Sequence, residues 1–428
     1  MGSEATRRLA DEPVDHRFKG LPPDAQAAGL TVGQLAAERR SLYGGGFTTP
    51  VLTLDAEALE HNLAALAAFC ERHGLGFAPH GKTCMAPQLF ERQIELGALG
   101  ITVAMPHQAR VCRAFGIEKI FLANELVDAP ALRWVAAELA ADPDFRFVCY
   151  VDSVRGVELM DAALRGHTER RVDVVVELGA GAEGRTGVRT EAECHEIAAA
   201  VVATDTLRLS GVAGYEATMP GADATTVRAW MERLVALAAD FDKAGLFAGR
   251  DLPEIIVSAG GSEWFDVVAD VFSAVPELSL PVLKLLRSGA YLSHDHGWYS
   301  GLTPFKDRIP EEGGLQPAFR LWTQVVSRPT PGQAFVNAGK RDIAYDLGLP
   351  QVLAVRGADG RERPGTGITV AKLSDQHAWL DTEEGTGLEV GDWVALGMAH
   401  PCTIFEKWPL IPVVEPDGTV TDCIRTFF

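Results

Sequence analysis

Short apolar runs alternate with longer amphipathic stretches between residues 75 and 290, and this alternation restricts the possible folds more than any other feature. Eight of the runs are predicted strands, at residues 76–80, 100–104, 119–123, 145–151, 172–178, 208–214, 254–258 and 282–287. Helical patterns lie between them, as at residues 86–95, 131–141, 192–203 and 225–244. An open doubly wound sheet has the same periodicity, but eight β/α units in about 215 residues favour closure. The pattern therefore predicts an α/β fold of the (β/α)8 TIM-barrel type.

The pattern changes after about Pro304. Short strand candidates separated by Gly, Pro and Asp follow, without a long helical pattern, at residues 321–327, 333–337, 352–356, 367–372, 377–382, 392–396 and 413–415. They predict a second, mainly antiparallel β domain, to which residues 49–54 contribute a strand. We therefore expect a barrel at residues 55–304, and a β domain formed by residues 1–54 and 305–428.

Composition excludes several classes of protein. The formal net charge of -19 and the lack of a Lys/Arg run argue against a nucleic-acid surface. Seven scattered cysteines without a CxxC pair predict no disulfide framework and suit a reducing cytoplasm. No apolar run approaches eighteen residues and the N-terminus is mixed in charge, so neither a membrane span nor a signal peptide is expected.

Lys82 ends the first predicted strand, inside the turn Pro79-His80-Gly81-Lys82-Thr83. Most lysines lie on solvated helix faces, whereas one at the C-terminal end of a barrel strand points to the face where barrel enzymes carry out their chemistry. A solvated turn lysine is the alternative. The same face should also receive Asn124, Asp152, the 179–187 loop, Tyr215, the 258–262 loop and Arg287.

Two glycine-rich loops follow later strands. Residues 179–184 match GxGxxG, but Arg185 and further loop residues follow instead of a helix, and the unit is fifth in the series, so we reject a dinucleotide site. Ser258-Ala259-Gly260-Gly261-Ser262 follows the seventh strand, where barrels commonly bind phosphate through backbone N–H groups and hydroxyls. Glu177, on an apolar strand, is expected to have a cationic partner.

A histidine and a cysteine stand two apart in His400-Pro401-Cys402. On a strand, such residues project from the same face and can bind one metal ion, and zinc suits this ligand pair. A buried cysteine beside a hydrogen-bonded histidine is the alternative. His294, His296 and His377 have no assigned role.

These segments together resemble the D-threonine aldolase and D-serine dehydratase family of pyridoxal phosphate enzymes, which have the alanine-racemase-like fold (fold type III). The resemblance runs from about Thr49 to Trp408. It implies that Lys82 forms a Schiff base with pyridoxal 5′-phosphate, that Arg185 approaches the cofactor ring, and that Tyr215 lies near it. It further implies a phosphate cup at Ser258, Gly260, Gly261 and Ser262, and a divalent metal, zinc by ligand type, on His400 and Cys402.

The resemblance also implies an activity. We expect a pyridoxal-phosphate- and metal-dependent lyase that eliminates water from a D-β-hydroxy amino acid, giving a 2-oxo acid and ammonia, because histidine plus cysteine is typical of the dehydratases and histidine plus aspartate of the aldolases. Retro-aldol cleavage to glycine and an aldehyde, or a noncatalytic pyridoxal phosphate carrier, are the alternatives. A homodimer with the site near the subunit interface is expected, with a small amino acid as the ligand.

Overall fold

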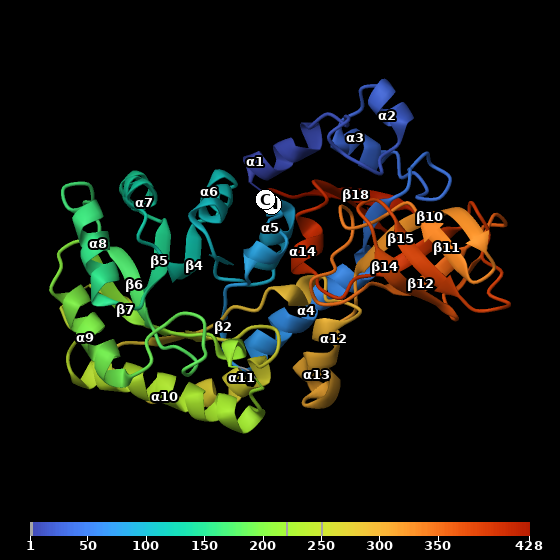
Figure 1. The fold of residues 1–428 in the computed structure, drawn as a ribbon. Helices are drawn as coiled ribbons and strands as arrows, with labels where there is room; N and C mark the ends of the chain where they lie inside the picture. The colour runs from blue at the N-terminus through green and yellow to red at the C-terminus, as the bar shows by residue number, and fades with distance from the viewer. Residues whose placement is uncertain (1–2, 220, 250) are drawn as a thin grey trace.

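Eight parallel strands form a barrel in the computed structural model, which describes residues 3–219, 221–249 and 251–428 (Figure 1). Their spatial order is β2-β9-β8-β7-β6-β5-β4-β3. A parallel bridge between His80 and Thr102 joins the two end strands, where Thr102 N donates to Pro79 O at 2.9 Å. The bounds are β2 (Gly76–Phe77), β3 (Ile101–Val103), β4 (Lys119–Glu125), β5 (Arg146–Val151), β6 (Val172–Glu177), β7 (Leu207–Ala213), β8 (Ile255–Ala259) and β9 (Val282–Leu286). The predicted barrel is confirmed.

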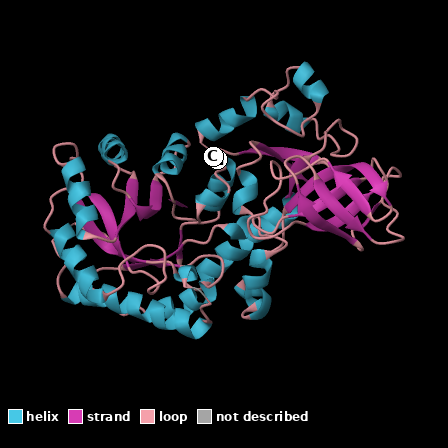
Figure 2. Cartoon of the chain, viewed as in Figure 1, coloured by secondary structure: helices cyan, strands magenta, loops and turns pink. Residues whose placement is uncertain are grey.

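Helices surround this sheet (Figure 2). They are α4 (Ala56–Arg72), α5 (Pro87–Glu95), α6 (Pro106–Ala114), α7 (Ala129–Ala141), α8 (Val154–Leu164), α9 (Glu191–Val202), α10 (Ala224–Lys243) and α11 (Phe265–Ser273). Several begin at a side chain that accepts a hydrogen bond from the first turn, as Asp55 does for α4 and Ser153 for α8. Leu59, Leu63 and Leu66 of α4 are buried at helical spacing, so this helix packs one apolar face inward.

The barrel interior is filled by side chains that point inward from the strands. Ala78, Phe121, Val148, Tyr150, Val175, Ala213, Ile256 and Leu285 form one buried cluster. This packed layer separates the mouth at the C-terminal ends of the strands from the opening at their N-terminal ends.

A ten-stranded, mainly antiparallel sheet lies beside the barrel (Figure 1). Its strands are β1 (Val51–Asp55), β10 (Phe319–Thr330), β11 (Gln333–Val336), β12 (Gln351–Arg356), β13 (Glu362–Pro364), β14 (Ile368–Leu373), β15 (Ala378–Thr382), β16 (Trp393–Gly397), β17 (Leu410–Val414) and β18 (Val420–Arg425). β1 pairs with β10, with Val51 opposite Trp322, so the N-terminal segment joins this sheet as expected. The strands β13 and β18 were not predicted.

Short helices complete the chain. They are α1 (Glu4–Arg7), α2 (Pro23–Ala27), α3 (Val32–Ala37), α12 (Trp298–Leu302), α13 (Pro304–Asp307) and α14 (Cys402–Phe405). Val32 and Leu35 of α3 belong to a buried cluster with Val420 and Cys423 of β18. None of the helices in the described ranges is long and apolar enough to cross a membrane.

Candidate active site

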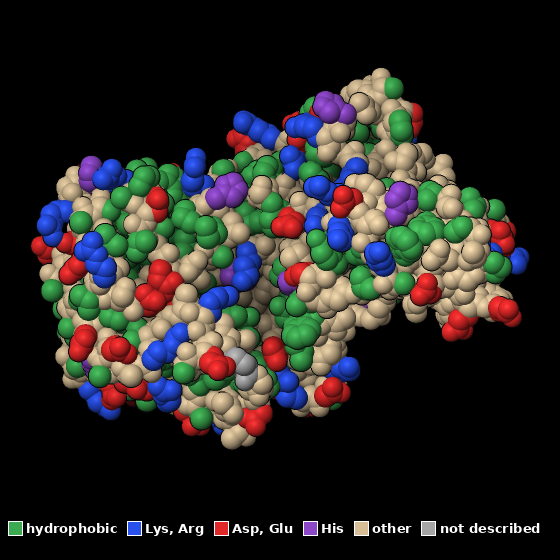
Figure 3. Space-filling view, in the orientation of Figure 1, with side chains coloured by type: hydrophobic (Ala, Val, Ile, Leu, Met, Phe, Trp, Pro, Cys, Tyr) green, Lys and Arg blue, Asp and Glu red, His purple; other side chains and the backbone are tan. Residues whose placement is uncertain are grey.

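A cavity of about 420 Å³ lies at the C-terminal mouth of the barrel. Most of the predicted site residues line it together: Lys82, Arg185, Tyr215, Gly260, Gly261, Ser262 and Cys402. The other lining side chains include His80, Thr83, Asn124, Tyr150, Glu177, Thr186, Arg287 and Tyr299. Ser258 and His400 stand outside this lining. In the surface view, Lys, Arg and His side chains lie along the recess between the barrel and the β-sheet (Figure 3).

Lys82 lies in the single 3-10 turn Gly81–Thr83, directly after the first barrel strand. A Cβ atom at Gly81 would come within 2.7 Å of Ile101 and 2.9 Å of Phe90, so glycine allows this turn to pack tightly against the barrel. Burial lowers the pKa of Lys82; Cys402 opposes this change, and the nearby Arg185 and Arg287 reinforce it. A lysine with a lowered pKa is more readily the neutral amine that acts as a nucleophile or base.

Arg287 is a buried cation at the centre of the mouth, only 4% exposed. Its Nε donates to Ser258 Oγ at 2.8 Å and its second guanidinium nitrogen donates to Gly214 O at 2.6 Å. Ser258 Oγ in turn donates to Leu285 O at 3.0 Å. Ser258 therefore orients Arg287 from outside the cavity.

The glycine loop after β8 has its own internal acceptor. The N–H groups of Gly260 and Gly261 donate to the two carboxylate oxygens of Glu216, each at 3.0 Å. A Cβ at Gly261 would come within 2.7 Å of the Tyr215 ring, so the loop packs against this ring. These two N–H groups are therefore already bonded, and Ser258 is bonded to Arg287. Of the four residues predicted to bind the phosphate, Ser262 is the one still available in this conformation.

The cavity fits an anionic, ring-shaped cofactor. Arg185 and Arg287 supply two cationic side chains beside Lys82, and a phosphate needs such charge. His80 Nδ1 and the Tyr150 hydroxyl are buried in the cavity wall without a hydrogen-bond partner among the described residues. Buried polar atoms are normally bonded, so a polar ligand would satisfy them.

Three carboxylates stand at the ends of adjacent strands. Glu125, Asp152 and Glu177 each place an oxygen within 4.8 Å of the others. Burial, followed by the negative charge of the nearby Glu177, raises the pKa of Glu125 to about 8, so Glu125 keeps its proton to a higher pH than an exposed glutamate does. The cation expected beside Glu177 is Arg287, which lowers the pKa of Glu177 against the larger effect of burial, although the two form no ion pair in the described ranges; Arg185 lies over the Tyr215 ring instead.

The metal pair is brought together by a loop. The strand expected through His400 and Cys402 ends at Gly397, and Cys402 instead begins α14. Cys402 nevertheless lies close enough to His400 to raise the pKa of its ring, and Cys402 Sγ lies 3.4 Å from Thr83 Oγ1 beside Lys82. The strand predicted through this pair is therefore wrong, and a loop brings the two residues close together instead.

Asp346 orients the His400 ring. Its Oδ2 lies 2.6 Å from His400 Nδ1, and its Oδ1 accepts a hydrogen bond from Thr403 at 2.7 Å. Burial disfavours the charged ring, but Cys402 and Asp346 outweigh it and raise the pKa of His400 to about 9. Metal-binding histidines typically have such a carboxylate on the nitrogen away from the ion, so the donor set fits a metal at His400 Nε2 and Cys402 Sγ.

The three histidines without an assigned role, His294, His296 and His377, lie outside the cavity lining. His377 is exposed on the β-sheet, whereas burial lowers the pKa of His294 and of His296 to about 4 each. Sequence reasoning missed Asp346 and Glu125. Asp346 is 54 residues from His400 in a loop, and no local pattern links the two.

The chain is similar to proteins of known activity. Residues 54–263 match the family described as "Alanine racemase, N-terminal domain", and residues 318–414 match the "Putative serine dehydratase domain". The 3-hydroxy-D-aspartate aldolase of Paracoccus denitrificans (strain Pd 1222) is 28% identical over 357 residues, which cover 82% of this chain and 84% of that protein. The D-threonine aldolase of Arthrobacter sp. is 27% identical over 376 residues, 87% of this chain and 90% of that one.

Solved structures have the same arrangement. D-threonine aldolase from Filomicrobium marinum superimposes with a TM-score of 0.73 at 25% identity, over 89% of this chain and 95% of that one. D-threo-3-hydroxyaspartate dehydratase from Delftia sp. HT23 gives a TM-score of 0.67 at 20% identity, over 89% and 98%. The barrel and the antiparallel sheet therefore form the fold shared by these proteins.

Proposed function

We propose that the chain is a pyridoxal-phosphate-dependent lyase of D-β-hydroxy amino acids, because it matches an alanine racemase N-terminal domain followed by a serine dehydratase domain and is similar to two aldolases of such substrates. The observation that carries the proposal is the meeting of Lys82 and Cys402 in one cavity. The two residues are 320 positions apart, so only the fold brings the amine and the thiol together.

Lys82 would hold the cofactor and move the proton at Cα of the substrate. Its position in a cationic pocket and its lowered pKa favour a neutral amine, which both roles need. Pyridoxal phosphate, when bound, supplies an electron sink for the carbanion formed at Cα. Arg287 and Arg185 would meet anionic groups of cofactor or substrate, while Tyr215 packs along the glycine loop.

His400 and Cys402 would hold a divalent metal, with Asp346 fixing the histidine ring. Zinc suits a nitrogen and a thiolate ligand, and a metal there would supply Lewis acidity next to the lysine. Solved mutants of D-threo-3-hydroxyaspartate dehydratase replace a histidine and, two positions later, a cysteine, and the cysteine mutant is in a metal-free form. The spacing of His400 and Cys402 is the same, which supports the assignment.

Loss of water to give a 2-oxo acid and ammonia is the reaction that we favour, because the dehydratase has a histidine and a cysteine at the same spacing as His400 and Cys402. Retro-aldol cleavage is the second candidate, since the curated relatives at 27% and 28% identity are aldolases. Incubation of the protein with D-serine, D-threonine and D-3-hydroxyaspartate, followed by assay of 2-oxo acid and glycine, distinguishes the two. A 2-oxo acid as the main product supports the dehydratase; glycine with an aldehyde assigns the aldolase instead.

We further propose a homodimer in which the partner covers the rim of this site. Trp298 and Tyr345 are 50% and 45% exposed, and Leu347 and Leu349 are exposed beside them. Trp298 N donates to Ala399 O, and Tyr345 precedes the Asp346 that holds His400, so these side chains surround the metal pair. Large apolar and aromatic side chains exposed together are typical of an interface. Sedimentation should show a dimer that Trp298→Asp dissociates; a monomer with full activity contradicts the proposal.

A further inference from the structure

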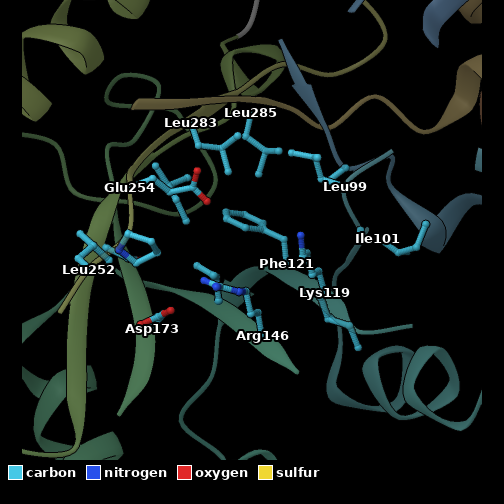
Figure 4. Close-up of a pocket in the computed structure, with 17 residues that line it drawn as sticks. Leu99, Ile101, Lys119, Phe121, Arg146, Asp173, Leu252, Glu254, Leu283 and Leu285 are labelled. Atoms are coloured by element: carbon cyan, nitrogen blue, oxygen red, sulfur yellow. The ribbon is translucent and has the colours of Figure 1, made fainter. Parts of the chain in front are cut away.

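A second cavity, of about 230 Å³, opens at the other end of the barrel (Figure 4). It lies among the N-terminal ends of the strands and shares no lining residue with the cavity that contains Lys82. Phe121, Val148, Ile256 and Leu285 of the buried interior layer form its inner wall. It is therefore a separate chamber, and the reaction proposed above makes no use of it.

The centre of this chamber is apolar. Leu283, Leu285 and Leu99 point toward the Phe121 ring (Figure 4). Leu99 is 41% exposed, so part of this apolar wall is open to water. An aliphatic group placed against these side chains would remove apolar surface from water, which is favourable. The volume suits a ligand smaller than a drug-sized molecule.

One side of the rim carries uncompensated positive charge. Lys119 and Arg146 are direct partners across β4 and β5, and like charges in this position repel each other. Neither makes an ion pair within the described ranges. Asp173, on the next strand, is already bonded to Arg208, at 2.9 Å from its second guanidinium nitrogen. A ligand carboxylate between Lys119 and Arg146 would relieve this repulsion.

The other side of the rim carries a single negative charge. Glu254 directs its carboxylate toward the Phe121 ring, and the Lys119 amine lies on the other side of that ring (Figure 4). In the described part of the chain Glu254 has no ion-pair partner. Glu254 would repel a simple carboxylate and the two cations would repel a simple amine, whereas a molecule with both charges would satisfy all three side chains.

We propose that this chamber binds a free amino acid with an aliphatic side chain. Its carboxylate meets Lys119 and Arg146, its ammonium group meets Glu254, and its side chain packs on Leu283, Leu285 and Phe121. This site lies on the face opposite the chemistry, so an amino acid bound there takes no part in turnover.

Isothermal titration of the holoenzyme with valine, leucine, isovalerate and isobutylamine tests the proposal, with the cofactor absorbance followed in parallel. We expect valine and leucine to bind more tightly than the acid or the amine, without a change in that absorbance. Lys119→Met should weaken valine binding about tenfold or more, since a charge-assisted contact is lost. Glu254→Gln should reverse the order and favour isovalerate.

Two further variants separate this chamber from the active site. Leu283→Trp fills the apolar centre and should abolish valine binding, whereas Lys243→Met, at an exposed lysine of α10, should leave it unchanged. Valine binding that persists in both Lys119→Met and Leu283→Trp would place the ligand elsewhere and overturn the proposal. An absence of valine and leucine binding to the unaltered protein would overturn it as well.

Discussion

The carboxylate of Asp346 lies 2.6 Å from Nδ1 of His400, and this contact leaves Nε2 as the nitrogen that is free to bind a metal. Asp346 comes from the loop after Ile343 and Ala344, far from His400 in sequence, and Thr403 fixes its other oxygen at 2.7 Å. The pair therefore sets the tautomer and the direction of the ring before any ion arrives.

Replacing Asp346 should weaken metal binding. We expect Asp346→Asn to reduce zinc affinity by about 10-fold to 100-fold, the usual effect of losing such a carboxylate. Competition with a chromogenic chelator measures this directly and does not depend on turnover. Asp359→Asn, at an exposed turn, is the matched control. Unchanged zinc affinity in Asp346→Asn would show that the contact does not support a metal ligand.

Replacing Glu125 should change how stability depends on pH. The folded-state pKa of Glu125 is raised from 4.5 to about 8, so the folded protein keeps a proton that the unfolded chain releases. The free energy of unfolding therefore falls as the pH rises from 4.5 to about 8, because the folded state binds more protons than the unfolded one in this range.

The amide in Glu125→Gln does not titrate in this range. The free energy of unfolding of this variant, relative to that of the unaltered protein, should therefore increase from pH 5 to pH 8. We expect a relative gain of roughly 1 to 3 kcal/mol across this window, which thermal melts at both pH values would detect. Glu169→Gln, at an exposed position, is the control. If the melting temperatures of Glu125→Gln and of the unaltered protein changed in parallel between the two pH values, the raised pKa of Glu125 would be contradicted.

Replacing Cys402 should change the products. A thiolate donates more charge to a metal than a carboxylate does, so we expect the substrate hydroxyl to be lost more readily with Cys402 and deprotonated more readily with aspartate. Cys402→Asp should shift the products from 2-oxo acid toward glycine, and Cys402→Ala should lose most of both. An unchanged product ratio in Cys402→Asp would show that this ligand does not control the reaction.

Much of the fold was predictable, because eight apolar runs at regular spacing leave few alternatives to a barrel. The β-sheet was harder to read: β13 is three residues long and exposed, and β18 follows a turn close to the C-terminus, so neither has a strong periodic signal. Lys82 and Cys402 were found through local motifs. Asp346 and Glu125 were not, because their roles depend on partners that only the folded chain brings near.

The loop after β8 shows a second limit of prediction from the sequence. Its glycines suggested two N–H groups directed at a phosphate, but Glu216 accepts both of them. A glycine-rich sequence indicates that the backbone can approach an acceptor closely, and it does not say which acceptor is present. The carboxylate of a neighbouring strand end satisfies the same N–H groups.

The covalent link between Lys82 and the cofactor is the central claim, and one measurement tests it most directly. Purified protein should absorb visible light as a pyridoxal phosphate enzyme, and reduction with borohydride followed by peptide mass spectrometry should place the phosphopyridoxyl group on Lys82. Lys82→Ala should lose that label, while Lys284→Ala, at a strand position outside the active-site cavity, should keep it. A label on another lysine, or an unlabelled protein, would contradict the account.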